Sequence, residues 1–220
     1  MKRASDIPDR SYLTLKHHYE HCLLEHGDTH KGMDWPNERD AKLRFDVMLD
    51  VVKEQQTNGI SILDIGCGTG HLLEHICEKK LELGSYRGID ISEIMISQAS
   101  EKHPDVEFTC MDLLDYSAQE IPAVIEPADY IILNGVFTEK RDMTQEQMDS
   151  FFSSMLERSF AICRKGLAFN VMSTHVDWMR DDLYHLAYDR LAEIIMKIVG
   201  RNHIIRADYG LYEYTVYTYH

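Results

Sequence analysis

The chain has 220 residues, 44% of them hydrophobic and 27% charged, which excludes a disordered chain and predicts one domain, with or without an extension. Its 23 Lys and Arg face 37 Asp and Glu, and the formal net charge of −14 argues against nucleic acid or an anionic membrane as partner. No run approaches the roughly 20 apolar residues that span a bilayer, and the start lacks the apolar stretch of a signal peptide, so we expect a cytoplasmic protein.

Two helical patterns precede any predicted strand. Apolar and aromatic residues recur at helical spacing from Tyr12 to Leu23 and again from Ala41 to Val52. The segment between them is rich in Gly, Asp, Asn and Pro, which predicts a loop. We therefore expect residues 1–58 to form a helical extension and residues 59–220 to form one compact domain.

From Ile60 onward, short apolar runs alternate with helical patterns. The predicted strands span 60–66, 85–90, 106–112, 128–134, 166–173, 203–208 and 211–219. The predicted helices span 71–80, 92–103 and 183–200, and Ser92 is the expected N-cap of the second. A further helix is predicted to begin at the capping box of Thr144 and Gln147. This alternation predicts an α/β, Rossmann-like, doubly wound and mostly parallel sheet of seven strands. The short connection around Gly210 makes the C-terminal strand antiparallel.

Polar residues and glycines stand at the predicted strand ends, where ligands bind in such sheets. They are GCGTG at 66–70, Asp90, Asp112 and Asn134. Glycines let backbone amides approach a ligand closely, a carboxylate after the second strand can take both hydroxyls of a ribose, and one after the third can take an adenine amino group. A dinucleotide site is the competing interpretation, but its G-x-G-x-x-G fingerprint would need glycine where His71 stands.

These motifs resemble those of the class I S-adenosylmethionine-dependent methyltransferases. LDIGCGTG is similar to the first motif of that family, GID to the second, CMD to the third and LNGV to the fourth, and the resemblance runs from Ile60 to the C-terminus. It implies S-adenosylmethionine as cofactor and S-adenosylhomocysteine as product. The residues it implies for the cofactor are Asp64, Gly66, Cys67, Gly68 and Gly70 at the methionine moiety, Asp90 at the ribose, Ile91, Met95, Asp112 and Leu113 at the adenine, and Asn134 and Gly135 near the sulfonium.

The N-terminal extension commonly forms a lid in the family that this sequence resembles. Arg44 falls on the apolar face of its helix, beside Phe45 and Met48, where a charge is costly unless it meets an anion. We expect that anion to be the carboxylate of the cofactor or an acidic group of the acceptor. A surface Arg that extends its charged end into water is the alternative.

Candidate general bases lie in three places: His17 and His18 on the first predicted helix, Glu139 after the fourth strand, and His175 with Asp177 after the fifth, and we expect Glu139, His175 and Asp177 to be the catalytic ones. The segment from His175 to Tyr184 is dense in hydrogen-bonding side chains, and its alternative interpretation is a solvated connection. Aromatic and basic residues of this segment, of the extension and of the fourth strand end are candidates for acceptor binding: Tyr12, Tyr19, Trp35, Phe137, Trp178, Arg180 and Tyr184.

Neither a disulfide nor a metal site is expected. The five cysteines are an odd number without CxxC spacing, as in reduced proteins. His17 with His21 and Cys22 with His26 have helical i,i+4 spacing, but the two pairs point to different helix faces.

The sequence thus predicts a methyltransferase that moves a methyl group to an oxygen, or a nitrogen, of a small-molecule acceptor by in-line displacement. A general base is optional, because an amine or an ionised acid needs none. Neither nucleic acid nor membrane is an expected partner, and the chain is expected to be a monomer or homodimer. A protein or RNA methyltransferase and a non-catalytic cofactor-binding module remain alternatives.

Overall fold

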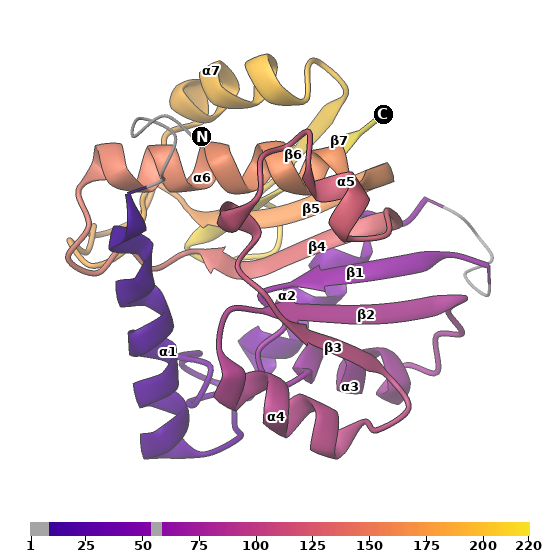
Figure 1. The fold of residues 1–220 in the computed structure, drawn as a ribbon. Coiled ribbons are helices and arrows are strands. Elements are labelled where there is room, and N and C mark those ends of the chain that lie inside the picture. Colours follow the sequence, from indigo (N-terminus) through magenta and orange to yellow (C-terminus); the bar gives the residue numbers. More distant parts are fainter. Residues whose placement is uncertain (1–8, 54–58) are drawn as a thin grey trace.

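The computed structural model describes residues 9–53 and 59–220 of the chain (Figure 1). A seven-stranded sheet of order β3-β2-β1-β4-β5-β7-β6 forms its centre. The strands are β1 (Ser61–Ile65), β2 (Ser85–Asp90), β3 (Glu107–Cys110), β4 (Ala128–Phe137), β5 (Cys163–Met172), β6 (His203–Arg206) and β7 (Glu213–Tyr219). β7 is antiparallel to both of its neighbours, β5 and β6, and the other pairings are parallel. The predicted fold class is confirmed.

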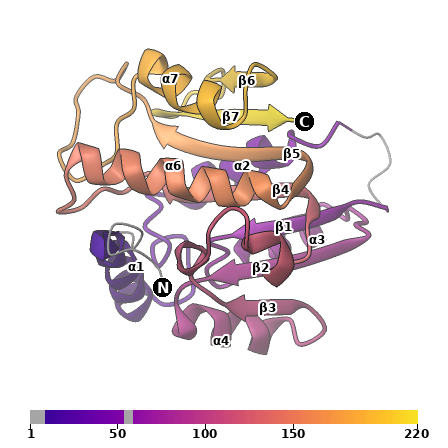
Figure 2. The same cartoon turned by 45° about the horizontal axis from the view of Figure 1, so that its top comes forward.

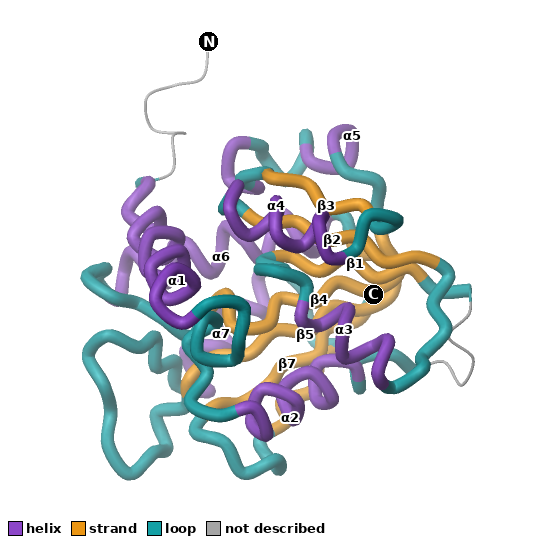
Figure 3. Tube along the Cα trace, turned by 90° about the horizontal axis from the view of Figure 1, so that it is seen from below, coloured by secondary structure: helices purple, strands orange, loops and turns teal. Residues whose placement is uncertain are grey.

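Helices cover both faces of the sheet. One face carries α5 (Ile121–Val124), α6 (Gln145–Ala161) and α7 (Tyr188–Ile198), which Figure 2 shows in front of the strands. The other face carries α2 (Glu38–Leu49), α3 (His71–Glu78) and α4 (Glu93–Lys102) (Figure 3). α1 (Leu13–His26) belongs to neither layer, because it lies across the carboxyl ends of the parallel strands (Figure 1). No helix among the described residues has the length and apolar character needed to cross a bilayer.

The core has one apolar cluster on each side of the sheet. Phe137, Phe152 and Phe169 meet edge to face in the larger cluster, between the sheet and α6, and all three are fully buried. Phe45 and Met48 of α2 pack in the second cluster, together with α3 and β1. The predicted extension is therefore divided: α2 is a layer of the sheet, whereas α1 and the loop after it cross the strand ends.

The predicted helix over 183–200 is wrong at its start, because α7 begins only at Tyr188. The preceding residues run extended beside the sheet: the Tyr184 amide donates to Thr138 O at 2.8 Å and the Leu186 amide to Met172 O at 3.0 Å. These backbone bonds outweigh the helical spacing of the side chains. The predicted capping box at Thr144 and the Ser92 N-cap are both confirmed.

β4 also extends beyond its predicted end. A register shift lies between Leu133 and Phe137 in its pairing with β5, and Gly135 within it has a left-handed φ of 80°. Such a bulge bends the strand and re-aims the neighbouring side chains. Asn134, predicted as the last residue of the strand, and Gly135, predicted after it, thus both lie inside a bent strand.

Candidate active site

A pocket opens at the carboxyl ends of β1, β2 and β4, with α1 as one wall. It encloses about 1140 Å³, its open mouth included. Most of the residues predicted for the cofactor line it together: Asp64, Gly66, Cys67, Gly68, Asp90, Ile91, Met95, Asp112, Leu113, Asn134 and Gly135. Tyr12, Tyr19 and Trp35 of the acceptor candidates line it too.

The glycine-rich turn after β1 forms the floor of the pocket. Gly66 and Gly68 have left-handed φ values of 76° and 54°. A Cβ at Gly66 would lie 2.6 Å from Val136 Cγ2, and one at Gly68 would lie 3.0 Å from Met33 Sδ. Only glycine fits these two positions without strain, so the turn keeps its backbone open to a ligand.

Two carboxylates stand beside this turn, Asp64 buried and Asp90 half-buried. Asp90 accepts from the Gly68 amide at 3.0 Å and from the Ser92 amide at 2.8 Å, which fixes the orientation of its carboxylate. Burial raises the pKa of Asp90, although these amide bonds act against it. Burial also raises the pKa of Asp64 to about 7, while the Tyr86 hydroxyl, which donates to Asp64 at 2.6 Å, lowers it.

The end of β4 offers an unused acceptor. Asn134 Oδ1 is buried and has no hydrogen-bond partner among the described residues, and Asn134 lines the pocket. An unpaired buried amide oxygen is costly unless a ligand donates to it. The ammonium group of an amino acid is such a donor, so the pocket fits the methionine end of S-adenosylmethionine on this observation, and Asp90 fits its ribose.

We call residues 9–37, which precede α2, the N-terminal segment. Side chains of this segment contact the ends of β1, β2, β3 and β4. The Tyr12 hydroxyl donates to Asp112 at 2.7 Å after β3, and the Tyr19 hydroxyl donates to Gly135 O at 3.2 Å in β4. The Ser92 hydroxyl after β2 donates to Glu20 at 2.7 Å. The 3-10 turn Arg10–Tyr12 and α1, which follows it directly, therefore contact the ends of three strands, β2, β3 and β4.

Asp28, just after α1, makes the fourth of these contacts, at the end of β1. Its carboxylate accepts from the Thr69 hydroxyl at 2.5 Å in the glycine-rich turn and lies 2.8 Å from His71 Nε2. Lys102 Nζ of α4 donates to it at 2.7 Å. Asp28 thus joins the N-terminal segment to the turn on which the cofactor is expected to lie.

Arg44 meets an anion, but that anion belongs to the chain itself. Its Nε donates to Glu213 of β7 at 2.8 Å, and both side chains are buried. Its guanidinium also lies 4.1 Å from the ring centre of Trp35. Arg44 does not line the pocket, and the predicted contact with a cofactor or acceptor carboxylate is replaced by this internal ion pair.

Several other predicted residues lie outside the pocket. His175 and Asp177 are exposed: His175 stacks on Tyr188, and Asp177 accepts from Tyr212 at 3.4 Å. Trp178 is 66% exposed, and Arg180 is paired with Asp182. Tyr184 and Phe137 are fully buried in the core, and Gly70 caps α3 beside the pocket.

Among the candidate bases Glu139, His175 and Asp177, Glu139 is the one whose charge affects the pKa of a residue that lines the pocket. It is 7% exposed and accepts from Arg141 at 3.2 Å. Burial and the nearby Asp34 raise its pKa, against the opposing effect of Arg141. Its charge also contributes to raising the pKa of Tyr19, which lines the pocket, after burial as the larger cause.

The apolar part of the pocket lining was not predicted from the sequence. This part is built by Leu15, Met33, Phe45, Met111, Phe151 and Met155. Phe151 and Met155 have the helical spacing of the buried face of α6, and this spacing does not indicate a pocket. Lys16 and His71 also line the pocket, and no local pattern distinguishes them from surface residues.

Comparison with known proteins also indicates a methyltransferase. A family model described as a methyltransferase domain matches residues 63–157. A Mycobacterium tuberculosis protein that carries a provisional methyltransferase name is 29% identical over 161 residues, or 71% of this chain and 90% of that protein.

Two solved structures share the fold at low identity. The plantazolicin methyltransferase BpumL, in complex with a substrate analogue and S-adenosylhomocysteine, superposes with a TM-score of 0.57 and 16% identity over 96% of this chain and 98% of its own. The small RNA methyltransferase HEN1 superposes with a TM-score of 0.56 and 16% identity over 81% of this chain and 25% of its own.

Proposed function

Because the chain belongs to the class I S-adenosylmethionine-dependent methyltransferases, we propose that it methylates an oxygen or a nitrogen of a small-molecule acceptor. The observation that carries the proposal is the wall that the N-terminal segment builds over the pocket. Tyr19 and Trp35 from this segment line the pocket together with Phe151 and Met155 of α6, and Tyr12 stacks on Phe151. A concave, mostly apolar and partly covered pocket suits a small acceptor better than a protein or RNA surface.

Positioning supplies most of the catalysis in this proposal. S-adenosylmethionine, when bound, supplies a methyl group already activated on a sulfonium. Asp90 would hold the ribose hydroxyls, Asn134 Oδ1 would accept from the amino group, and Asp112 would accept from the adenine; all three residues line the pocket. Holding two reactants in line can lower the barrier by about 7–11 kcal/mol.

The N-terminal segment acts as the lid. Its contacts at the four strand ends involve Asp112 and Gly135 themselves, the same groups that are proposed to hold the cofactor. Cofactor binding and the seating of the lid are therefore coupled, since one set of polar groups serves both.

Glu139 is the base we retain for an acceptor that must lose a proton. Its charge acts on Tyr19, which lines the pocket, and burial raises its pKa above the ordinary value of a glutamate, which makes it a stronger proton acceptor. His175 and Asp177, exposed outside the pocket, have no part in the proposal.

Transfer of a radioactive methyl group from S-adenosylmethionine into a cell extract tests the proposal. Label in the small-molecule fraction is the expected result, lost in Asp90→Ala and kept in the matched Asp105→Asn variant, which removes an exposed carboxylate. Label in protein or RNA would overturn the choice of acceptor. Binding of the cofactor in calorimetry without any transfer would favour a non-catalytic module.

A further inference from the structure

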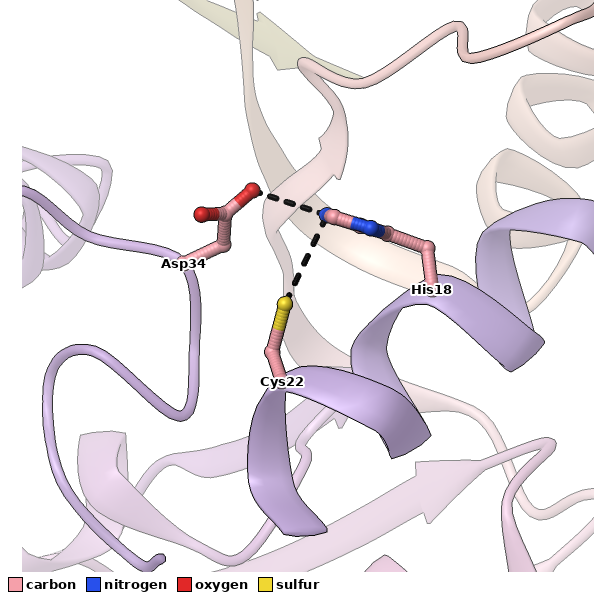
Figure 4. Close-up of side chains that lie close together, drawn as sticks. All are labelled: His18, Cys22 and Asp34. Atoms are coloured by element: carbon pink, nitrogen blue, oxygen red, sulfur yellow. Dashed lines mark hydrogen bonds and ion pairs between the residues drawn. The ribbon is translucent and has the colours of Figure 1, made fainter. Parts of the chain in front are cut away.

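Three metal-binding atoms converge on the N-terminal segment, outside the residues that line the pocket (Figure 4). His18 Nε2 lies 2.8 Å from Asp34 Oδ2 and 3.7 Å from Cys22 Sγ, and all three atoms lie within 4.8 Å of one another. His18 and Cys22 are one turn apart on the same face of α1, and Asp34 reaches them from the loop after it.

The distances come close to those of a tetrahedral zinc site. Zn–S bonds of about 2.3 Å and Zn–N bonds of about 2.0–2.1 Å place sulfur and nitrogen about 3.5 Å apart at a tetrahedral angle. The observed separation of His18 Nε2 and Cys22 Sγ is 3.7 Å. Nitrogen and carboxylate oxygen would lie about 3.4 Å apart, so Asp34 must withdraw by about 0.6 Å. Its side chain is 39% exposed and can make this movement.

Hydrogen bonding engages two of the three atoms strongly. When His18 Nε2 carries a proton, it donates to Asp34 at 2.8 Å, and the Cys22 sulfur at 3.7 Å is at most a weak second partner. A cation would engage all three atoms at once as lone-pair donors. Its two charges match one thiolate and one carboxylate.

We propose that His18, Cys22 and Asp34 bind a divalent cation of the zinc class, with one tetrahedral position left for water or a substrate atom. Binding releases the proton of the Cys22 thiol. The cation joins α1 to the loop that follows it. Tyr19 and Met33, the chain neighbours of two ligands, line the pocket, so the site fixes the wall of the pocket.

Titration of the chelator-treated protein with Co²⁺ tests this site, because thiolate ligation gives Co²⁺ a charge-transfer absorption in the near ultraviolet. We expect one equivalent to bind with this absorption, and Zn²⁺ to displace it. Cys22→Ser should abolish the absorption and weaken Zn²⁺ binding at least about tenfold. The matched controls are Cys77→Ser, an exposed cysteine, and His21→Ala, an exposed histidine of the same helix.

Asp34→Asn provides a second variant in the loop, should Cys22→Ser fail to fold by circular dichroism. It should retain the absorption and weaken Zn²⁺ binding. Absence of the absorption in the unmodified protein would overturn the proposal. So would its persistence in Cys22→Ser or its loss in Cys77→Ser.

Discussion

Asp64 makes the stability of the cofactor-free protein depend on pH in a direction unusual for a carboxylate. Its side chain is 2% exposed at the end of β1, and burial raises its pKa to about 7 from the ordinary value of 3.8. The folded protein therefore holds the proton more tightly than the unfolded chain does. Stability from this group is complete below pH 3.8 and is lost as the pH rises through 7.

The size of this effect follows from the two pKa values. At about 1.4 kcal/mol per pKa unit, ionising Asp64 destabilises the fold by about 4 kcal/mol above pH 7. Asp64→Asn removes the titration and keeps an acceptor oxygen for the Tyr86 hydroxyl. We expect the variant to gain about 4 kcal/mol relative to the parent between pH 4 and pH 8.

Urea unfolding at a series of pH values measures this difference. The free energies of the two proteins should diverge by about 1.4 kcal/mol per pH unit between pH 4 and pH 7 and stay parallel above that. Asp105→Asn controls for the loss of one carboxylate at an exposed site. A difference between parent and Asp64→Asn that is independent of pH would refute the reasoning.

Three further substitutions test other parts of the molecule. Asp28→Asn weakens the attachment of the N-terminal segment to the glycine-rich turn, and S-adenosylhomocysteine should dissociate at least about fivefold faster in stopped flow; an unchanged rate would argue against a lid. Glu213→Ala leaves the buried charge of Arg44 unpaired and should lower the free energy of unfolding by about 3–5 kcal/mol in urea titration, and a loss below 1 kcal/mol would contradict the ion pair. Phe137→Ala should cost about 3–5 kcal/mol in the same assay, against little change for the exposed Ile204→Ala, and equal losses for the two would refute the assigned core.

The cofactor side of the pocket could be predicted from the sequence because its signals are local. Glycines and carboxylates at the ends of apolar runs mark the strand ends, and the parallel sheet brings those ends to one edge. Asp64, Asp90 and Asn134, far apart in the chain, line one pocket for this reason.

The places of the other predicted site residues could not be predicted in the same way, because their contacts are with residues distant in sequence. Arg44 finds its partner at Glu213, and the hydroxyl of Tyr184 finds Asp149 of α6 at 2.6 Å. Tyr184 is fully buried in a stretch whose polar residues favoured an exposed loop. The i,i+4 pairs considered from the sequence were His17 with His21 and Cys22 with His26, and the pair of His18 and Cys22 was missed because only the folded loop brings Asp34 to it.

The bulge of β4 also has a consequence for the order in which the chain acquires its native state. The Gly135 amide donates to Asn170 Oδ1 at 2.8 Å, and the Asn170 amide group donates to Glu213 at 3.0 Å. Glu213 in turn holds Arg44, whose guanidinium lies over Trp35, beside Gly135. This series of contacts is complete only when β7, the last strand, is in place. During synthesis, a chain that has not yet reached residue 213 has every glycine and carboxylate of the cofactor site and also Asn170, but it lacks Glu213, which orients the Asn170 amide toward the bend, so binding competence is expected to arrive late, with β7.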